Sequence, residues 1–254
     1  MHCIKHVTIL LLSIVISGSL LAQQEESIVY SPDLFEANDE IVPKQVQPAP
    51  TPRITIKSLI IPVTLISYGV FAQCSNKLKR MDVRIKNVVR RDPDFHTKID
   101  NYLQYAPSFA VYALNAAGVK GKNNFRDRTL IYLLSNTMMG ITVQAIKKIT
   151  RVARPEGFGT NAFPSGHTAT AFAGAEFLRQ EFKDVSPWYG VAGYVAATTT
   201  GALRMFNNKH WFRDVVAGAG FGILSTQVAY VLAPVIIKKL FPKKTSTRFD
   251  PATF

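Results

Sequence analysis

Apolar runs without charged residues alternate with short charged segments over most of the chain. Several runs approach the ~20 residues that a helix needs to cross a bilayer. They are only moderately hydrophobic, because Ser, Thr, Asn, Gly and Pro interrupt them. The pattern predicts an all-α fold, a polytopic transmembrane helical bundle with about five or six core helices. The runs cover residues 58–76, 101–119, 129–146, 160–175, 185–203 and 215–237.

The alternative to a membrane bundle is a soluble bundle in which the apolar helices are buried. Two of the runs are rich in small residues, which let helices pack closely inside a membrane. The spacing Gly218-x3-Gly222 permits a particularly close approach. The composition therefore favours the membrane bundle. The small residues are Ala169, Ala171, Ala173, Gly174 and Ala175 in one run, and Ala217, Gly218, Ala219, Gly220 and Gly222 in the other.

Four segments are expected along the chain. Residues 1–22 are predicted to be a signal peptide, with a basic start, an apolar stretch and Ala22 before the cleavage site. The residue at the −3 position of that site is not small, so an uncleaved membrane anchor is the alternative. Residues 23–57, rich in Pro and acidic residues, predict an extended linker. Residues 58–240 are expected to form the helical domain, and residues 241–254 a basic C-terminal tail.

The net charge of +13 is compatible with nucleic acid, anionic lipid or a phosphorylated substrate as a partner. Nucleic acid is disfavoured, because the chain has no zinc-finger spacing and no aromatic RNA-binding motif, and its basic residues fall between apolar runs. Cys3 lies in the leader, so Cys74 has no partner for an intrachain disulfide in the mature protein. No Cys/His cluster indicates a metal site, and no cofactor is expected.

Three short blocks contain the residue types that phosphate chemistry needs. Lysine and arginine suit the oxygens of a phosphate dianion, and arginine offers them a planar fork. Two histidines suit one nucleophile and one proton donor. The blocks are KKITRVARP with Lys147 and Arg154, FPSGHTATAF with Ser165, Gly166 and His167, and ALRMFNNKHWFRD with Arg204, His210 and Asp214.

The blocks resemble the type 2 phosphatidic acid phosphatase (PAP2) superfamily, and its membrane lipid phosphatase branch in particular. The family pattern is Lys-x6-Arg-Pro, then Pro-Ser-Gly-His, then Ser-Arg-x5-His-x3-Asp. All three blocks occur here in order and with the same internal spacing, except that Leu203 replaces the serine before the arginine. The resemblance covers roughly residues 101–237. It implies a helical bundle of the PAP2/haloperoxidase type.

The resemblance implies that His210 is the nucleophile and forms a phosphohistidine. Asp214 is expected to accept a hydrogen bond from the other ring nitrogen of His210, which would set its tautomer. His167 is expected to protonate the leaving group and then to activate water. His96 lacks such a context and is interpreted as a surface residue.

Lys147, Arg154 and Arg204 are expected to bind the nonbridging phosphate oxygens, which removes the need for a metal. Ser165 and Gly166 precede a predicted helix, whose first N–H groups favour an anion. Pro155 is expected to end the helix that carries Lys147. The remaining basic residues of these blocks are interpreted as membrane-interface cations, namely Lys148, Arg151, Lys209 and Arg213.

The leading hypothesis is a metal-independent phosphatase that removes a phosphate monoester or diphosphate from a membrane lipid head group. Undecaprenyl diphosphate, phosphatidylglycerol phosphate, phosphatidic acid and lipid A are family substrates, and the sequence does not choose among them. The alternatives are a soluble periplasmic acid phosphatase, a vanadium-dependent haloperoxidase, and a transport or scaffold protein with a relict site. Detergent dependence and vanadate-dependent bromide oxidation separate these classes. The oligomeric state is left open.

The expected location is the bacterial cytoplasmic membrane, with the active site facing the periplasm. The basic tail lies on the face opposite to the three blocks and is predicted to be cytoplasmic. A cleaved signal peptide followed by six crossings would instead place the site inside, so one run must fail to span. Residues 58–76, which contain Pro62 and Gly69, are suspected. The basic segment 77–91 conflicts with this topology, because it also has cytoplasmic character.

Overall fold

The computed structural model describes residues 54–90 and 95–241, and these residues form helices and no strand. The expected all-α fold is confirmed for them. The predicted signal peptide, most of the linker and nearly all of the tail lie outside the described residues. The helices are α2 (Ile56–Cys74), α3 (Asn76–Val89), α4 (Ile99–Leu103), α5 (Ala106–Ala116), α6 (Phe125–Thr150), α7 (Gly166–Phe182), α8 (Pro187–Phe206) and α9 (Phe212–Leu240).

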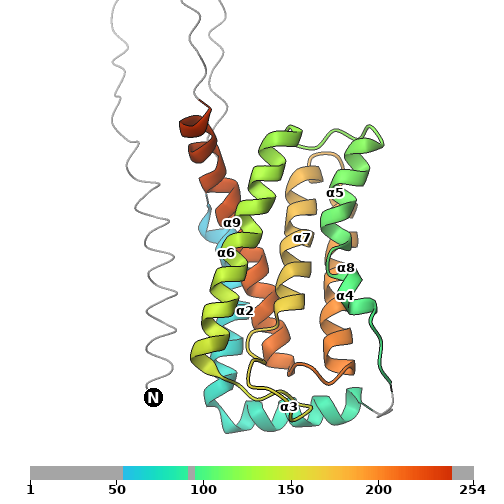
Figure 1. Cartoon of the computed structure of the whole chain (residues 1–254), viewed down its shortest axis with the longest axis vertical. Coiled ribbons are helices and arrows are strands. Elements are labelled where there is room, and N and C mark those ends of the chain that lie inside the picture. Colours follow the sequence, from blue (N-terminus) through green and yellow to red (C-terminus); the bar gives the residue numbers. More distant parts are fainter. Residues whose placement is uncertain (1–53, 91–94, 242–254) are drawn as a thin grey trace, which may run out of the picture. The chain divides into compact units, whose positions relative to one another are not determined.

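Helix α7 lies at the centre of the bundle, where it packs against α5, α8 and α9 (Figure 1). Helix α9 also packs against α2 and α6. The α7–α9 contact is made by glycine, as the Gly218-x3-Gly222 spacing predicted. A Cβ atom on Gly218 would lie 2.5 Å from the main-chain oxygen of Ser165, and one on Gly222 would overlap the main-chain oxygen of Ala169. Backbone contact therefore sets the register of α9 against α7.

An apolar cluster and a buried ion pair stabilise the half of the bundle near the end of α7. Phe177 and Phe182 belong to the cluster, together with Tyr230 of α9. Arg128 of α6 donates from Nε to Glu181 Oε2 at 3.1 Å, and Tyr230 donates to Glu181 Oε1 at 2.6 Å. Breaking such a buried pair on one side leaves an uncompensated charge. This network therefore ties α6, α7 and α9 together.

Within residues 54–90 and 95–241, three helices are long and apolar enough to cross a membrane, namely α2, α6 and α9. Helix α2 is continuous despite Pro62, so the suspicion that residues 58–76 fail to span is not supported. Gly69, the second feature behind that suspicion, lets α2 lie close to α9, since its Cβ would be 2.6 Å from Cβ of Ala217. The run that breaks is 101–119, which divides into α4 and α5. Pro107 lies in the first turn of α5, where proline favours a new helix start.

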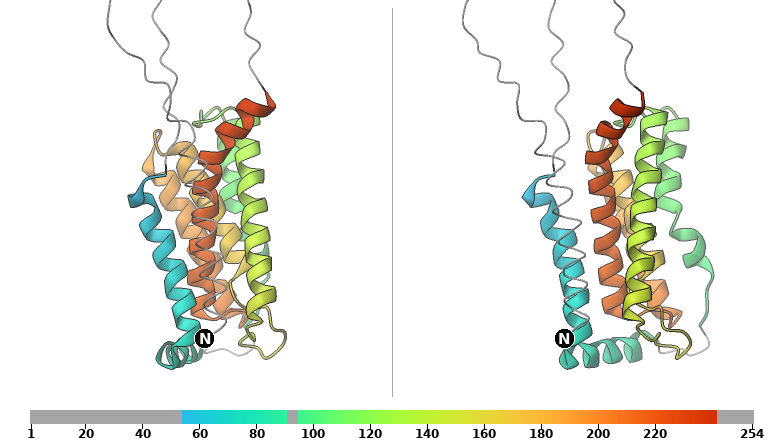
Figure 2. Two further views of the ribbon diagram at one scale, coloured as in Figure 1. Left: turned by 90° about the vertical axis from the view of Figure 1, so that its left-hand side faces the viewer. Right: turned by 60° about the vertical axis from the view of Figure 1, so that its left-hand side comes forward.

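One end of the bundle collects all three sequence blocks. Helices α6 and α8 end there, α7 and α9 begin there, and α3 lies across that end (Figures 1 and 2). We call this the catalytic end. At the opposite end α2 begins and α9 ends, so residues 54 and 241 lie on the same side of the bundle.

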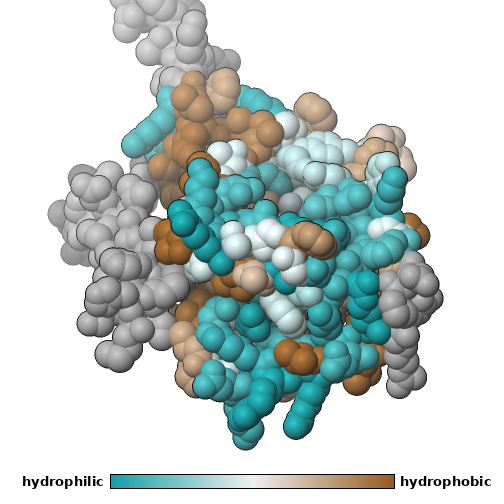
Figure 3. Space-filling model, turned by 60° about the horizontal axis from the view of Figure 1, so that its bottom comes forward, coloured by the Kyte–Doolittle hydropathy of each residue, from teal (hydrophilic) through white to brown (hydrophobic). Residues whose placement is uncertain are grey.

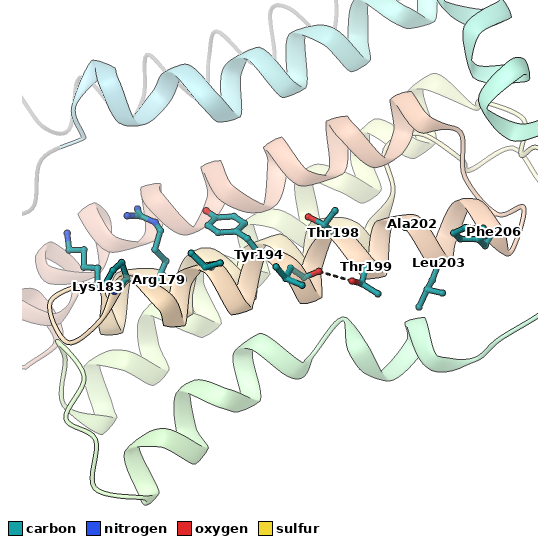
Figure 4. A pocket seen from close by; sticks show the side chains of 12 residues that line it. Arg179, Lys183, Tyr194, Thr198, Thr199, Ala202, Leu203 and Phe206 are labelled. Atoms are coloured by element: carbon teal, nitrogen blue, oxygen red, sulfur yellow. Dashed lines mark hydrogen bonds between the residues drawn. The ribbon is translucent and has the colours of Figure 1, made fainter. Parts of the chain in front are cut away.

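An apolar groove with a volume of about 730 Å³ follows the outer face of α8 (Figure 4). It extends from Arg179 and Lys183 at one end to Leu203 and Phe206 at the other. Arg204 does not line it, because its side chain is buried on the inner face of α8. The groove is therefore separate from the predicted phosphate-binding residues.

Candidate active site

His210 lies in the α8–α9 connection and is 4% exposed. Its Nδ1 atom is 2.8 Å from the main-chain oxygen of Ala162. A carbonyl oxygen can only accept, so Nδ1 carries the proton and Nε2 keeps its lone pair. The expected hydrogen bond from His210 to Asp214 is not formed, because Nδ1 and Asp214 Oδ2 are 3.8 Å apart. Ala162 sets the tautomer, and Asp214 faces the ring at ion-pair distance.

Asp214 is fully buried in the first turn of α9 and joins two blocks. Its Oδ2 atom accepts a hydrogen bond from the main-chain N–H of Trp211 at 2.9 Å. Its main-chain oxygen accepts from the N–H of Ser165, also at 2.9 Å. The second bond ties the start of α9 to the start of α7. The block with His210 and Asp214 and the Pro-Ser-Gly-His block are thus held in one position relative to each other.

The pKa of His210 lies well below its ordinary value of 6.5. Burial is the main cause, and the charges of Lys147, Arg204 and Arg154 add to it. The hydrogen bond to Ala162 opposes the shift without reversing it. His210 is therefore neutral at neutral pH, which is the form that can attack phosphorus.

This low pKa predicts the acid limb of the pH profile. Neutral His210 is present above its pKa and disappears as the pH falls through it, so kcat/KM should fall only at a pH below 6.5. The substrate phosphate itself titrates near pH ~6, so a variant is needed to identify the group. In Arg154→Gln one of the charges that lower the pKa is lost, and the limb should move to higher pH. A limb that stays in place in Arg154→Gln would show that His210 does not set it.

His167 is the second residue of α7, and its Nε2 atom is 2.9 Å from Oδ1 of Asn101 on α4. An amide oxygen accepts, so this contact places the ring proton of His167 on Nε2. When the ring is the imidazolium, with protons on both nitrogens, a proton held at Nε2 can be given up and the residue can serve as a general acid. The sequence blocks do not include Asn101, which lies 66 positions away from His167.

Arg204 is paired with Asp100, the neighbour of Asn101 on α4. Its Nη1 atom is 2.5 Å from Asp100 Oδ2, and both side chains are buried. Arg204 Nε is buried and has no hydrogen-bond partner among the described residues. The pair therefore orients the guanidinium and leaves a donor for an anion. No motif in the sequence marks Asp100, which directly precedes the charge-free run 101–119.

Asn161 brings the other two cations of the site together. Its main-chain oxygen accepts from Lys147 Nζ, and its Oδ1 accepts from Arg154 Nε at 2.8 Å. The expectation that Pro155 ends the helix of Lys147 is wrong. Helix α6 ends at Thr150, because Arg151 adopts a left-handed conformation with φ 46°.

Ser165 and Gly166 form the start of α7. The N–H of Ser165 already donates to Asp214, so it is not available for an anion. Ser165 Oγ accepts from Thr168 Oγ1 at 2.9 Å and keeps its own proton to donate. The N–H groups of Gly166 and His167 are the first of the helix and have no acceptor within it. They are the donors that α7 can offer to a phosphate.

Two cations that the sequence analysis assigned to the membrane interface form ion pairs with carboxylates of the protein. Arg213 is buried and forms an ion pair with Asp82 of α3. Lys209 donates to Glu156 Oε2 at 2.5 Å. Burial opposes the ionisation of Glu156, but Lys209 and Arg154 hold its pKa below the usual range. Both cations stabilise the loops around the site.

The remaining expectations for this region concern His96 and metals. His96 is exposed, as expected for a surface residue. No group of three or more His, Cys, Asp or Glu side chains suited to a metal occurs within residues 54–90 and 95–241. The three blocks and α4 bring together three basic side chains, two histidines and two carboxylates. The carboxylates are Asp100 and Asp214, which lie in the first turns of α4 and α9.

The part of the chain that holds these residues matches a known family. Residues 128–238 match the PAP2 superfamily, the family that the three sequence blocks resemble. All the predicted site residues fall inside the match. Asp82, Asp100 and Asn101 fall outside it.

One curated relative and two solved structures are similar to the chain. A lipid A 1-phosphatase of Porphyromonas gingivalis is 42% identical over 145 residues, which are 57% of this chain and 33% of that protein. The chain thus covers about a third of this relative's length. The LpxE structure of Aquifex aeolicus has a TM-score of 0.46, with 18% identity over 59% of this chain and 94% of that one. A transmembrane PAP2-type phosphatidylglycerolphosphate phosphatase of Bacillus subtilis has a TM-score of 0.48, with 18% identity over 72% and 99%.

Proposed function

We propose that the protein is a metal-independent membrane lipid phosphatase that works through a phosphohistidine on His210. The observation that carries the proposal is the tautomer of His210. Its Nδ1 proton is held by Ala162, so a neutral Nε2 lone pair remains in a site with three cations. A buried neutral imidazole among cations suits attack on an anionic phosphate.

In the first step, Nε2 of His210 attacks phosphorus and a P–N bond forms as the P–O bond to the leaving group breaks. His167 acts as the imidazolium, gives its Nε2 proton to the leaving oxygen and becomes neutral. The ring of His210 becomes positive, and the carboxylate of Asp214, at 3.8 Å from Nδ1, stabilises that charge. Lys147, Arg154 and Arg204 neutralise the transferring phosphoryl group.

In the second step, water attacks phosphorus and the P–N bond breaks. His167, now without its proton, accepts a proton from the water. Inorganic phosphate leaves and both histidines return to their starting forms. Asn101 is proposed to hold His167 in the correct tautomer between turnovers, and Asp100 to hold Arg204.

A lipid substrate is supported by the apolar surface around the bundle and by the lipid A 1-phosphatase relative. Ile61 and Phe71 of α2 and Ile141 of α6 are more than half exposed, which suits a bilayer rather than water. Phe158, in the loop at the catalytic end, is 81% exposed and is proposed to contact the lipid part of the substrate. The relative favours lipid A among the candidate substrates.

The chain length of the substrate tests this proposal. A long-chain lipid phosphate should have a larger kcat/KM than a short-chain one, each assayed below its micellar limit and in EDTA. Burial of each extra methylene is worth about 0.8 kcal/mol at most, so a few methylenes give a large preference. Equal kcat/KM values would indicate a soluble-type acid phosphatase with a permissive pocket. Activity that needs a divalent ion would contradict the metal-free mechanism.

We also propose that the catalytic end faces the periplasm. Lys238 and Lys239 lie at the opposite end of the bundle, where basic residues favour the cytoplasm. Since α2 begins at that same end, the residues directly before it share that compartment. A cleaved signal peptide would place them on the other side. An uncleaved anchor that enters from the cytoplasm would place them there too, so the periplasmic proposal requires that residues 1–22 do not cross the membrane in that direction.

Cysteine labelling tests the orientation. Thr160 is exposed at the catalytic end, and Lys122 is exposed at the opposite end. In a Cys3→Ser, Cys74→Ser background, a membrane-impermeant thiol reagent should label Thr160→Cys in intact spheroplasts. Lys122→Cys should react only after the membrane is broken. The reverse pattern would place the active site in the cytoplasm.

A further inference from the structure

Helix α3 carries three stripes of side chains along its length. Lys77, Arg80 and Arg84 have the spacing i, i+3 and i+7, so they share one face. A second face holds four apolar side chains, and a third faces the bundle. The second face consists of Leu78, Met81, Ile85 and Val88, and the third of Asp82, Lys86 and Val89.

The third face attaches α3 to the catalytic end of the bundle. Asp82 is 1% exposed and accepts from Arg213 through both the guanidinium and the main-chain N–H. Lys86 Nζ donates to the main-chain oxygen of Pro155 at 2.8 Å and lies 5.6 Å from the ring centroid of Trp211. The helix therefore lies across the catalytic end instead of continuing along the bundle (Figures 1 and 2).

The first face carries uncompensated positive charge. Lys77, Arg80 and Arg84 are exposed, and none has a hydrogen-bond or ion-pair partner among the described residues. Asp82 is the acidic residue of α3, and Arg213 already neutralises it. Hydrophilic residues cover most of this end of the molecule (Figure 3). Beside the cations, Val88 is 62% exposed, so the apolar stripe is only partly covered by protein.

We propose that α3 is an interfacial helix that binds anionic phospholipid head groups of the leaflet at the catalytic end. A basic stripe next to an exposed apolar stripe is the arrangement with which helices lie in a membrane interface. Each basic residue near an anionic membrane surface strengthens binding to that surface about fivefold. The three together should therefore favour anionic over neutral lipid by a factor on the order of a hundred. The cations of α3 then serve lipid binding and are not a signal of cytoplasmic location.

A consequence for catalysis rests on the proposed function. Anionic lipids gathered along α3 lie beside the loop of Pro155, which leads to Arg154 and Asn161. A substrate that is itself an anionic lipid is concentrated at the same place. Loss of the stripe should therefore raise KM and leave kcat unchanged.

Hydrogen exchange of the full-length protein in nanodiscs tests the binding directly. The probe is phosphatidylglycerol, added to discs of phosphatidylcholine. It should slow the exchange of the α3 amides at least about threefold in the wild type, and high salt should reverse the effect. In the triple variant Lys77→Gln, Arg80→Gln, Arg84→Gln the slowing should be absent. The control variant Lys120→Gln, Lys122→Gln, Lys183→Gln, with exposed cations at the opposite end, should respond as the wild type does.

Two outcomes would overturn the proposal. If phosphatidylglycerol does not change the exchange rate of the α3 amides in the wild type, the helix binds no anionic lipid. An undiminished response in the triple variant would show that the stripe is not the binding surface. Because exchange is measured without substrate, a protein that lacks phosphatase activity would defeat the proposed function while leaving this result intact.

Discussion

Replacement of His210 by alanine is expected to lower kcat by a factor on the order of 10⁴ to 10⁶, with the fold retained. The lone pair on Nε2 is the proposed nucleophile, and water in its place would lack both its fixed position and the nucleophilicity of an imidazole nitrogen. Rapid quench with a ³²P-labelled substrate should trap a phosphoenzyme in the wild type and none in His210→Ala. The matched control is His96→Ala, because His96 is exposed and outside the site.

A phosphoenzyme that persists in His210→Ala would move the nucleophile to another residue. Wild-type turnover in that variant would remove the mechanism altogether. Loss of turnover in both His210→Ala and His96→Ala would indicate a general effect on folding, which a thermal melt in detergent would detect.

Replacement of Gly222 by alanine is expected to lower kcat/KM at least about a hundredfold. The new Cβ would overlap the main-chain oxygen of Ala169 and lie 2.8 Å from the N–H nitrogen of Ala173, so α9 must move away from α7. His167 begins α7 and Asp214 begins α9, so the movement separates the acid from the nucleophile block. A misplacement of about 1 Å can cost 10²-fold in rate. Overpacking should also destabilise the fold by about 1–3 kcal/mol.

Gly140→Ala provides the matched control, because Gly140 lies in α6 with no atom within 4 Å of its added Cβ. It should be neutral or slightly stabilising, since alanine favours a helix over glycine. Thermal melts and kcat/KM of both variants give the comparison. Equal behaviour of the two variants would show that the α7–α9 contact does not position the site.

The sequence predicted the part of the site that lies in short blocks. The spacing of Lys147, Arg154, His167, Arg204 and His210 indicated a common site, and the structure brings their blocks to one end of the bundle. That this site binds phosphate stays a prediction. The charge-free runs predicted most helices. The break between α4 and α5 was missed, because Pro107 lies inside a run whose hydrophobicity does not change there.

Contacts between distant residues could not be predicted from local patterns. Asp100 pairs with Arg204 across 104 positions, and Asp82 hydrogen-bonds to Arg213 across 131. Neither carboxylate differs in its sequence surroundings from a surface residue. Arg213 was interpreted as an interface cation for the same reason, since only its distant partner shows that it is buried. Ala162, which sets the tautomer of His210, acts through its backbone and has no side-chain signal.

The bond between the N–H of Ser165 and the main-chain oxygen of Asp214 bears on how the protein tolerates different bilayers. Helices tilt when the hydrocarbon thickness does not match their apolar length. Helices α7 and α9 are joined by this bond at one end and by glycine contacts along their length, so they tilt as one body. We therefore expect His167 of α7 and His210 beside α9 to keep their separation when membrane thickness changes. A cell that alters its lipids with temperature would thus change the surroundings of this site without changing the geometry of its chemistry.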